Sequence, residues 1–212
     1  MNAVGVQHDR MCSAGTCHDN TTWHGLVPRL LLEHGAIRVA EIGVWRGTLS
    51  AKILAQCPLV EQLILVDSWT PIYGTDPVRG LLVFGPGTDQ AEMDDAERTV
   101  RRRFADDVRV VIHTLPSREG AKRVPDRSLD AVLIDALHTY HACKEDILTW
   151  LPKLRPGGLM IGDDYSDWFP GVEIAVKEIF REHHRVLDQT WWAFPHEMTE
   201  GLCGARDRFK AI

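Results

Sequence analysis

The sequence predicts an α/β fold with a doubly wound, mostly parallel sheet, and three observations support this prediction. Short apolar runs alternate along the chain with segments that have the residue pattern of helices, which is typical of βαβ units. The apolar runs lack polar alternation, as expected for strands that are buried on both faces. The residues best suited to bind ligands follow predicted strands, at the edge where open sheets of this kind bind their ligands.

The first half of the chain predicts three helices and two strands, with a long polar segment between the second strand and the third helix. Gly35 can end the first helix, because glycine readily adopts the left-handed conformation of a helix C-cap. In chain order these elements are a helix over 21–35, a strand over 37–44, a helix over 48–57, a strand over 61–69, the polar segment 70–90 and a helix over 90–104.

The second half continues the same alternation. Ser117 is a good N-cap for a short helix, and Pro170 is suited to the first turn of another. In chain order we predict a strand over 108–115, helix 117–124, strand 129–137, a helix over 140–154 that is broken at "RPGG", strand 158–165, helix 170–180 and one strand over 184–194.

A length of 212 residues fits one domain. Residues 1–20 are expected to be a flexible tail, in which Cys12, Cys17 and His18 resemble half of a zinc site, but no second pair completes it. Their role stays open. Residues 70–90 form a connection too long for an ordinary βα loop, so they predict a lid or a substrate-binding segment.

Composition and charge exclude several classes of partner. A net charge of −6 and a pI near 5.9 argue against a nucleic-acid surface, which needs a basic face. No apolar run approaches the ~20 residues of a membrane span, and the N-terminus lacks a signal-peptide pattern. Five scattered cysteines suggest free thiols in a reducing compartment. We therefore expect a cytoplasmic protein without membrane or nucleic-acid partners.

The turn after the first predicted strand indicates a cofactor site. Glu41, Gly43 and Gly47 form the pattern E-x-G-x-x-x-G between a strand and a helix. Gly43 allows a sharp bend and close approach of a ligand, and the helix after Gly47 offers N–H groups to an anionic group. Glu41 stands where the dinucleotide fingerprint has glycine, so it would repel a pyrophosphate and suit an ammonium group.

The second predicted strand ends in Asp67, an acid placed to accept hydrogen bonds from ribose hydroxyls. A ribose and a positively charged portion together describe S-adenosylmethionine. The turn, Asp67 and the order of elements over roughly 35–195 resemble the class I S-adenosylmethionine-dependent methyltransferases. The resemblance implies a Rossmann-like sheet with an antiparallel strand near the C-terminus, and a homodimer is expected because related enzymes often form dimers.

The same resemblance implies roles for individual residues of the cofactor site. Glu41, Gly43 and Gly47 would line the methionine portion, and Asp67 would hold the ribose. The remaining cofactor contacts implied are Ser117 near the adenine, Trp45 packed against the cofactor, and Asp135.

Three aspartates at the ends of two further strands predict a metal site. Asp135 follows one buried strand, and Asp163 and Asp164 follow the next. Three converging carboxylates cannot all ionise cheaply unless a cation joins them, and a hard divalent cation suits oxygen ligands. Mg²⁺ is the expected metal, and Mn²⁺ or Ca²⁺ would fit the same ligands. The alternative is a purely structural role, for example as helix caps.

The pattern "DALHTY" followed by "PGGLMIGDDY" resembles the metal-dependent O-methyltransferases, of the catechol type and more closely of the macrolide-sugar type. Compared with the catechol pattern of Asp followed by Asp-Asn, Asp164 stands in place of Asn. The resemblance implies His138 as the base that removes the acceptor's proton, with Asp135 also catalytic. His141 is the alternative base, and the acceptor is expected to be a small-molecule hydroxyl of a sugar, diol or phenol.

Other functions stay open at this point. One alternative is a metal-independent methyltransferase that uses His138 alone. Another is a non-catalytic S-adenosylmethionine-binding protein. A nicotinamide-dependent enzyme is a further alternative, against which Glu41 argues. Nucleic-acid methylation is not expected, whereas protein acceptors are not excluded by the sequence.

Overall fold

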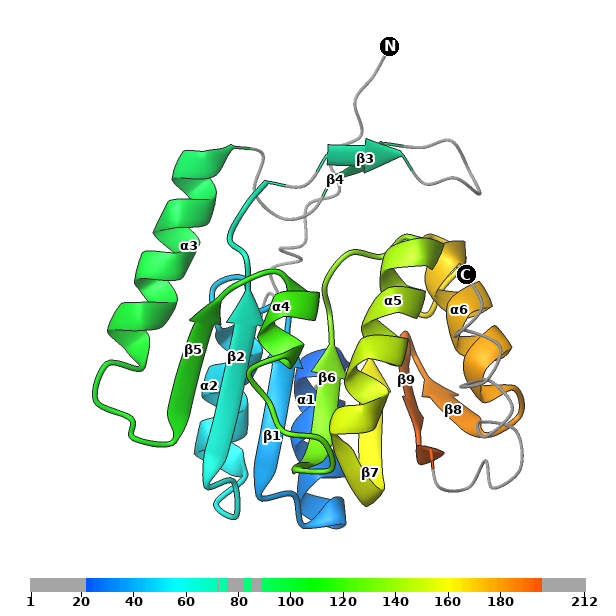
Figure 1. Ribbon diagram of the computed structural model, residues 1–212, viewed down its shortest axis with the longest axis horizontal. Helices are drawn as coiled ribbons and strands as arrows, with labels where there is room; N and C mark the ends of the chain where they lie inside the picture. The colour runs from blue at the N-terminus through cyan, green and yellow to red at the C-terminus, as the bar shows by residue number, and fades with distance from the viewer. Residues whose placement is uncertain (1–21, 72, 76–81, 85–88, 196–212) are drawn as a thin grey trace, which may run out of the picture.

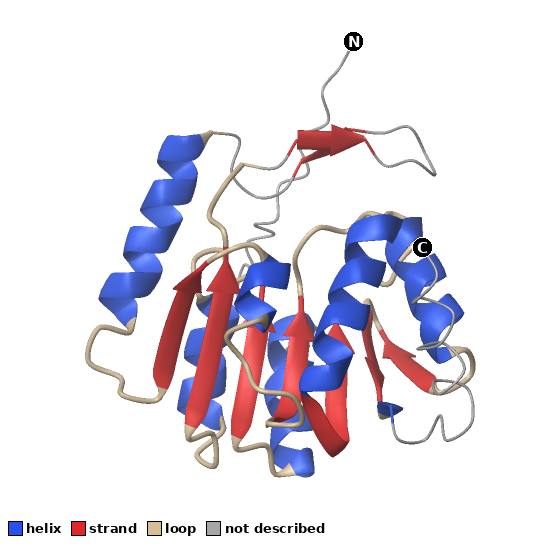
Figure 2. Ribbon diagram, viewed as in Figure 1, coloured by secondary structure: helices blue, strands red, loops and turns tan. Residues whose placement is uncertain are grey.

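A computed structural model of the chain shows a twisted seven-stranded sheet with helices on both faces (Figures 1 and 2). It describes residues 22–71, 73–75, 82–84 and 89–195. Within these residues, no helix has both the length and the apolar character that crossing a bilayer requires. The tail 1–20, with Cys12, Cys17 and His18, lies outside the described residues.

Five parallel strands form most of the sheet, and they confirm the predicted fold class. The strand order is β5-β2-β1-β6-β7-β9-β8, and neighbours among the first five pair in parallel. All six residues of β6 are buried, as expected for a strand covered on both faces. The parallel strands are β1 (Arg38–Ile42), β2 (Gln62–Asp67), β5 (Val110–Thr114), β6 (Leu129–Ile134) and β7 (Leu154–Gly162).

Helices cover the two faces of this sheet and give it two apolar cores. One core packs α1 (Trp23–His34), α2 (Thr48–Gln56) and α3 (Gln90–Arg103) on the sheet. The other packs α4 (Ser117–Ala121), α5 (Tyr140–Trp150) and α6 (Pro170–Phe180), with the 3₁₀ turn η1 (Leu151–Lys153) after α5. Gly35 ends α1 with φ of 64°, as the sequence predicts.

The C-terminal edge of the sheet corrects one prediction and confirms another. The single strand predicted over 184–194 is wrong, because the chain turns back at Asp188, which has φ of 57°. The turn separates β8 (His184–Leu187) from β9 (Thr190–Ala193), which pair antiparallel. Strand β9 also pairs antiparallel with β7, so the antiparallel strand expected near the C-terminus is confirmed.

Two local predictions are wrong, one because of strand pairing and one because of a side-chain hydrogen bond. Strand β7 begins at Leu154 rather than near 158, because "RPGG" belongs to the strand and lies at the register shift between β7 and β6. Ser117 does not cap α4, whose N-cap is Pro116 without a side-chain cap. The Ser117 hydroxyl instead bonds within the core.

The segment 70–90 is described only in part. Strands β3 (Tyr73–Thr75) and β4 (Leu82–Phe84) form an antiparallel pair, drawn beyond the carboxyl ends of the parallel strands in Figure 1. The side-chain amide of Gln90 donates to the carbonyl oxygen of Trp69 at 2.9 Å. This bond joins the two ends of the segment, and the prediction of a lid stays a prediction.

Candidate active site

Backbone hydrogen bonds continue past the ends of four adjacent strands and fix the predicted site residues in a row. Gly43 N–H donates to the carbonyl oxygen of Val66 at 3.0 Å, and Asp135 N–H donates to that of Ile42 at 2.9 Å. Asp163 N–H donates to the carbonyl oxygen of Ile134 at 3.2 Å. The glycine turn and the acidic residues therefore share one edge of the sheet.

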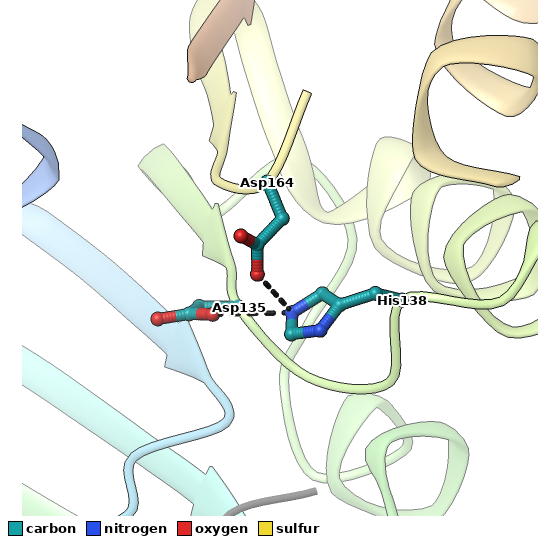
Figure 3. A group of neighbouring side chains, drawn as sticks. All are labelled: Asp135, His138 and Asp164. Carbon is teal, nitrogen blue, oxygen red and sulfur yellow. Dashed lines mark hydrogen bonds and ion pairs between the residues drawn. The ribbon is translucent and has the colours of Figure 1, made fainter. Parts of the chain in front are cut away.

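At this edge the structure brings together Asp135, His138 and Asp164 (Figure 3). One potential ligand atom from each lies within 4.8 Å of the others. His138 Nε2 is 3.0 Å from Asp164 Oδ2 and 3.4 Å from Asp135 Oδ1. The side chains of His138 and Asp164 are largely buried, so these charges interact with little screening by water.

The two carboxylates determine the charge state of His138. Burial alone would lower the pKa of this imidazole, because it disfavours the charged form. Hydrogen bonds to Asp135 and Asp164 outweigh burial and raise the pKa to about 10. His138 is therefore an imidazolium at neutral pH, and a cation already stands between the two carboxylates.

Asp163 lies beside this group but is not one of its three members. Burial, followed by the negative charges of Asp135 and Asp164, holds its pKa well above the usual range. Asp164 has φ of 60°, a left-handed conformation that is uncommon for residues other than glycine and is often found at functional sites. Of the predicted aspartate trio, the structure thus groups two with His138 and places the third within their electrostatic field.

The first-strand turn holds a buried carboxyl. Glu41 is 2% exposed, and its Oε2 accepts a hydrogen bond from the Ser50 hydroxyl of α2 at 2.6 Å. Burial raises the pKa of Glu41 to about 8, although the bond from Ser50 opposes this rise. An apolar residue would avoid this penalty, so a buried acid here favours a functional role.

Asp67 joins the turn after β1 to the turn after β2, a role that the sequence did not indicate. Its Oδ2 accepts from the backbone N–H groups of Val44 and Trp45, at 2.8 and 3.0 Å. Its Oδ1 accepts from Trp69 N–H at 2.8 Å. Trp45 and Trp69 both have positive φ, of 51° and 42°, and Trp69 Nε1 donates to the Trp45 carbonyl oxygen at 2.9 Å. Asp67 therefore stabilises two bulky residues in a strained conformation.

Ser117, predicted near the adenine, belongs to a buried polar cluster that includes an acid missed by the sequence analysis. Its hydroxyl oxygen accepts from Trp150 Nε1 at 2.9 Å and bonds to Asp146. Burial raises the pKa of Asp146 to about 6. Asp146 lies on the same face of α5 as Cys143, Ile147 and Trp150, and an acid within such an apolar stripe was the available signal.

The residues after His138 have structural partners. The Tyr140 hydroxyl donates to Glu178 at 2.5 Å and accepts from Lys144 at 2.8 Å, which joins α5 to α6. The ring of Phe169, the residue before α6, lies 4.9 Å from that of His138. His141 is exposed at the start of α5, so between the two predicted bases the structure places His138 in the acidic group.

A family of known sequences matches this chain over most of the described fold. The family is described as a methyltransferase domain, and its model matches residues 40–165. The chain belongs to this methyltransferase family. The resemblance to class I S-adenosylmethionine-dependent methyltransferases is thereby confirmed. No curated protein matches the sequence.

Solved structures share the fold of this methyltransferase at low identity. A calicheamicin methyltransferase, CalS11, is 17% identical, with 82% of this chain and 80% of that chain covered and a TM-score of 0.57. The O-methyltransferase NovP is 19% identical, with coverage of 79% and 75% and a TM-score of 0.56. A spermidine synthase from Thermotoga maritima is 13% identical, with coverage of 84% and 60% and a TM-score of 0.53. Enzymes with different names share this fold, so the chemistry must be argued from the site.

Proposed function

We propose that this methyltransferase transfers the methyl group of S-adenosylmethionine to a hydroxyl of a small molecule, with a divalent cation held at the acidic group. The acceptor class is a sugar, a vicinal diol or a phenol, and the setting is natural-product tailoring. The observation that carries the proposal is the convergence of Asp135, His138 and Asp164 at the carboxyl edge, beside Asp163. The names of CalS11 and NovP support the acceptor chemistry by analogy of fold.

The side chains present fit a hard divalent cation. Two carboxylates and one imidazole nitrogen lie within reach of one ion, and oxygen ligands of this kind suit Mg²⁺ or Mn²⁺. Burial raises the pKa of Asp163 first, and the negative charges of Asp135 and Asp164 add to this rise. A bound cation would relieve the repulsion among these charges. A bound cation would supply positive charge that orients the acceptor's oxygens and makes a hydroxyl more acidic.

Asp135, Asp164 and His138 each have a part in the proposed reaction. Asp135 and Asp164 orient His138, whose pKa would fall, with release of its proton, when these carboxylates bind a cation. The neutral imidazole would then take the proton that the acceptor hydroxyl loses. The hydroxyl oxygen forms the new bond to the methyl carbon while the carbon–sulfur bond breaks, and S-adenosylhomocysteine leaves. Much of the rate is expected to come from holding oxygen, carbon and sulfur in line.

A turnover assay tests this proposal against a metal-independent reaction. Methyl transfer from labelled S-adenosylmethionine is measured with a panel of catechols and sugars, in EDTA and after addition of Mg²⁺. We expect activity that EDTA abolishes and Mg²⁺ restores. Full activity in EDTA would rule out the cation, and cofactor binding without turnover on any acceptor would favour a non-catalytic binding protein.

Two pairs of variants assign the roles within the site. Asp164→Asn should abolish turnover, whereas Asp167→Asn, an exposed acid of the same loop, should not. His138→Gln should lower kcat by ~10²-fold or more, in the range of general-base catalysis, whereas His141→Gln should leave it unchanged. His138→Gln should also keep Mn²⁺ affinity if Asp135, Asp163 and Asp164 are the ligands, and lose it if His138 is a ligand.

A further inference from the structure

We propose that Gly43 and Gly171 are positioning residues that seat the segment carrying Asp135 and His138 from opposite sides. We call this segment, residues 135–140, the His138 loop. The inference rests on the proposed function for the consequence to cation binding, but its geometric content concerns the protein alone. If it is correct, the turn at Gly43 after β1, which we call the cofactor turn, determines the positions of Asp135 and His138 in the acidic group of Asp135, His138 and Asp164.

The first contact is between the cofactor turn and the backbone of Asp135. A Cβ atom added to Gly43 would lie 1.9 Å from the Asp135 carbonyl oxygen, 2.5 Å from its carbonyl carbon and 2.9 Å from the Ala136 Cα. These are backbone atoms, so no side-chain rotation can relieve the overlap. Asp135 N–H also donates to the carbonyl oxygen of Ile42, the residue before Gly43. Gly43 therefore sets where the Asp135 backbone lies, in addition to any contact with the cofactor.

The second contact is between α6 and the other end of the His138 loop. A Cβ atom on Gly171 would lie 2.4 Å from the backbone nitrogen of Tyr140, 3.0 Å from the carbonyl carbon of Thr139 and 3.1 Å from the carbonyl oxygen of His138. Gly171 is in the first turn of α6, immediately after Pro170. The Phe169 ring, at the same end of α6, lies 4.9 Å from the imidazole.

These two contacts explain how a short loop holds two charged side chains at fixed distances. Asp135 lies at one end of the His138 loop and His138 in its interior, and both ends of the loop pack on backbone that has no side chain at the contact. A displacement of either end changes the separations of 3.0 and 3.4 Å that join His138 to Asp164 and Asp135. We therefore expect alanine at either glycine to disturb the acidic group even without cofactor.

Three alanine variants separate this role from simple backbone strain. Gly43→Ala combines the overlap with a positive φ of 83°. Gly171→Ala has the overlap without a positive φ, and alanine is the better helix former. Gly157→Ala is the control, because Gly157 has φ of 80° with nothing within 4 Å of an added Cβ.

Two readouts are taken on each folded variant without cofactor. The imidazole NMR signals of His138, assigned by their loss in His138→Gln, report the metal-free loop. Calorimetry with Mn²⁺ reports the acidic group. We expect shifted His138 signals and at least about tenfold weaker Mn²⁺ affinity in Gly43→Ala and Gly171→Ala, in the range seen when a metal ligand loses its support. Gly157→Ala should match the wild type in both.

Each result decides one question. Unchanged His138 signals and wild-type Mn²⁺ affinity in Gly43→Ala and Gly171→Ala would overturn the inference. A wild type that does not bind Mn²⁺ would contradict the proposed cation site, while the NMR signals would still decide the inference. If Gly43→Ala does not fold, Gly171→Ala decides it alone, because Gly171 does not have a positive φ.

Discussion

His138 and Asp164 form the most directly testable pair at the scale of single residues. The pKa of His138 is raised to about 10 because hydrogen bonds to Asp135 and Asp164 outweigh burial. Asp164→Asn removes one of the two charges and keeps the size of the side chain. We expect it to lower the pKa of His138 by about one unit or more, measured by NMR titration of the imidazole in EDTA. The same pKa in Asp164→Asn and wild type would show that Asp164 does not control the proton.

Glu41 gives a second prediction for a single residue. Its pKa is raised from 4.5 to about 8, first because of burial, so the folded state keeps a proton that the unfolded state loses. This carboxyl therefore lowers the free energy of unfolding as pH rises from 4.5 to 8. Glu41→Gln has no such proton, so its stability should fall less over this range, by about 1 kcal/mol or more.

Urea denaturation at pH 5 and pH 8 measures this difference. The change in the free energy of unfolding between the two pH values is compared, rather than its absolute value, because glutamine introduces its own amide near Ser50. Glu41→Gln should at the same time weaken binding of S-adenosylhomocysteine, as expected if the carboxyl faces the ammonium group of the cofactor. Parallel pH profiles of stability for the two proteins would contradict the assignment of this titration to Glu41.

At the scale of elements, the sequence predicted the parallel strands and their helices because apolar runs and helix patterns alternate without ambiguity. It missed the hairpin of β8 and β9 because Asp188-Gln189 lacks the glycine that usually marks a tight turn. It also assigned Ser117 to a helix cap, which is the commonest use of serine before a short helix. The true partners of Ser117 lie on α5, more than twenty residues away along the chain, and local patterns carry no information about them.

The hydrogen bonds of Ser117 in α4 to Trp150 and Asp146 in α5 predict that loss of the hydroxyl destabilises the packing of these two helices. Ser117→Ala removes the acceptor of Trp150 Nε1 and a hydrogen bond to buried Asp146. Leaving buried polar groups without partners costs about 1–3 kcal/mol, so the variant should be destabilised by that order. Urea denaturation measures it, with Ser128→Ala as control, because the Ser128 hydroxyl donates to the carbonyl oxygen of Pro125 in an exposed turn. Equal losses in the two variants would argue against a buried link.

The site was predictable from sequence as far as it depends on strand ends. Asp135, Asp163 and Asp164 follow strands that are neighbours in the sheet, and in the structure they lie at one edge. Which side chain points at which was not predictable, because it depends on the φ of 60° at Asp164 and on the path of the His138 loop. The three hydrogen bonds from backbone N–H groups to the Asp67 carboxylate could not be predicted for the same reason.

At the scale of the whole molecule, the raised pKa of His138 predicts how stability depends on pH in the metal-free protein. For His138 the folded pKa of about 10 exceeds the unfolded value of 6.5. Its contribution to stability is therefore complete below pH 6.5 and is lost as pH rises through 10. The melting temperature in EDTA should fall between pH 7 and pH 10.

The variant His138→Gln separates this effect from other titrations, because it should flatten the fall of melting temperature over the same range. His141→Gln is the control, since His141 is exposed. A fall of equal size in wild type and His138→Gln would contradict the proposed ion pairs. The predicted homodimer is a separate matter, and sedimentation of the wild type tests it.

The central claim is that a divalent cation binds among the carboxylates at the end of β6 and β7. The most direct test is anomalous diffraction from a crystal grown with Mn²⁺ and S-adenosylhomocysteine. We predict an anomalous peak between Asp135 and Asp164, within ligand distance of carboxylate oxygens, and the nucleoside beside Gly43. A crystal with S-adenosylhomocysteine bound beside Gly43, saturating Mn²⁺ and no peak at this site, with His138 still between the two carboxylates, would contradict the claim.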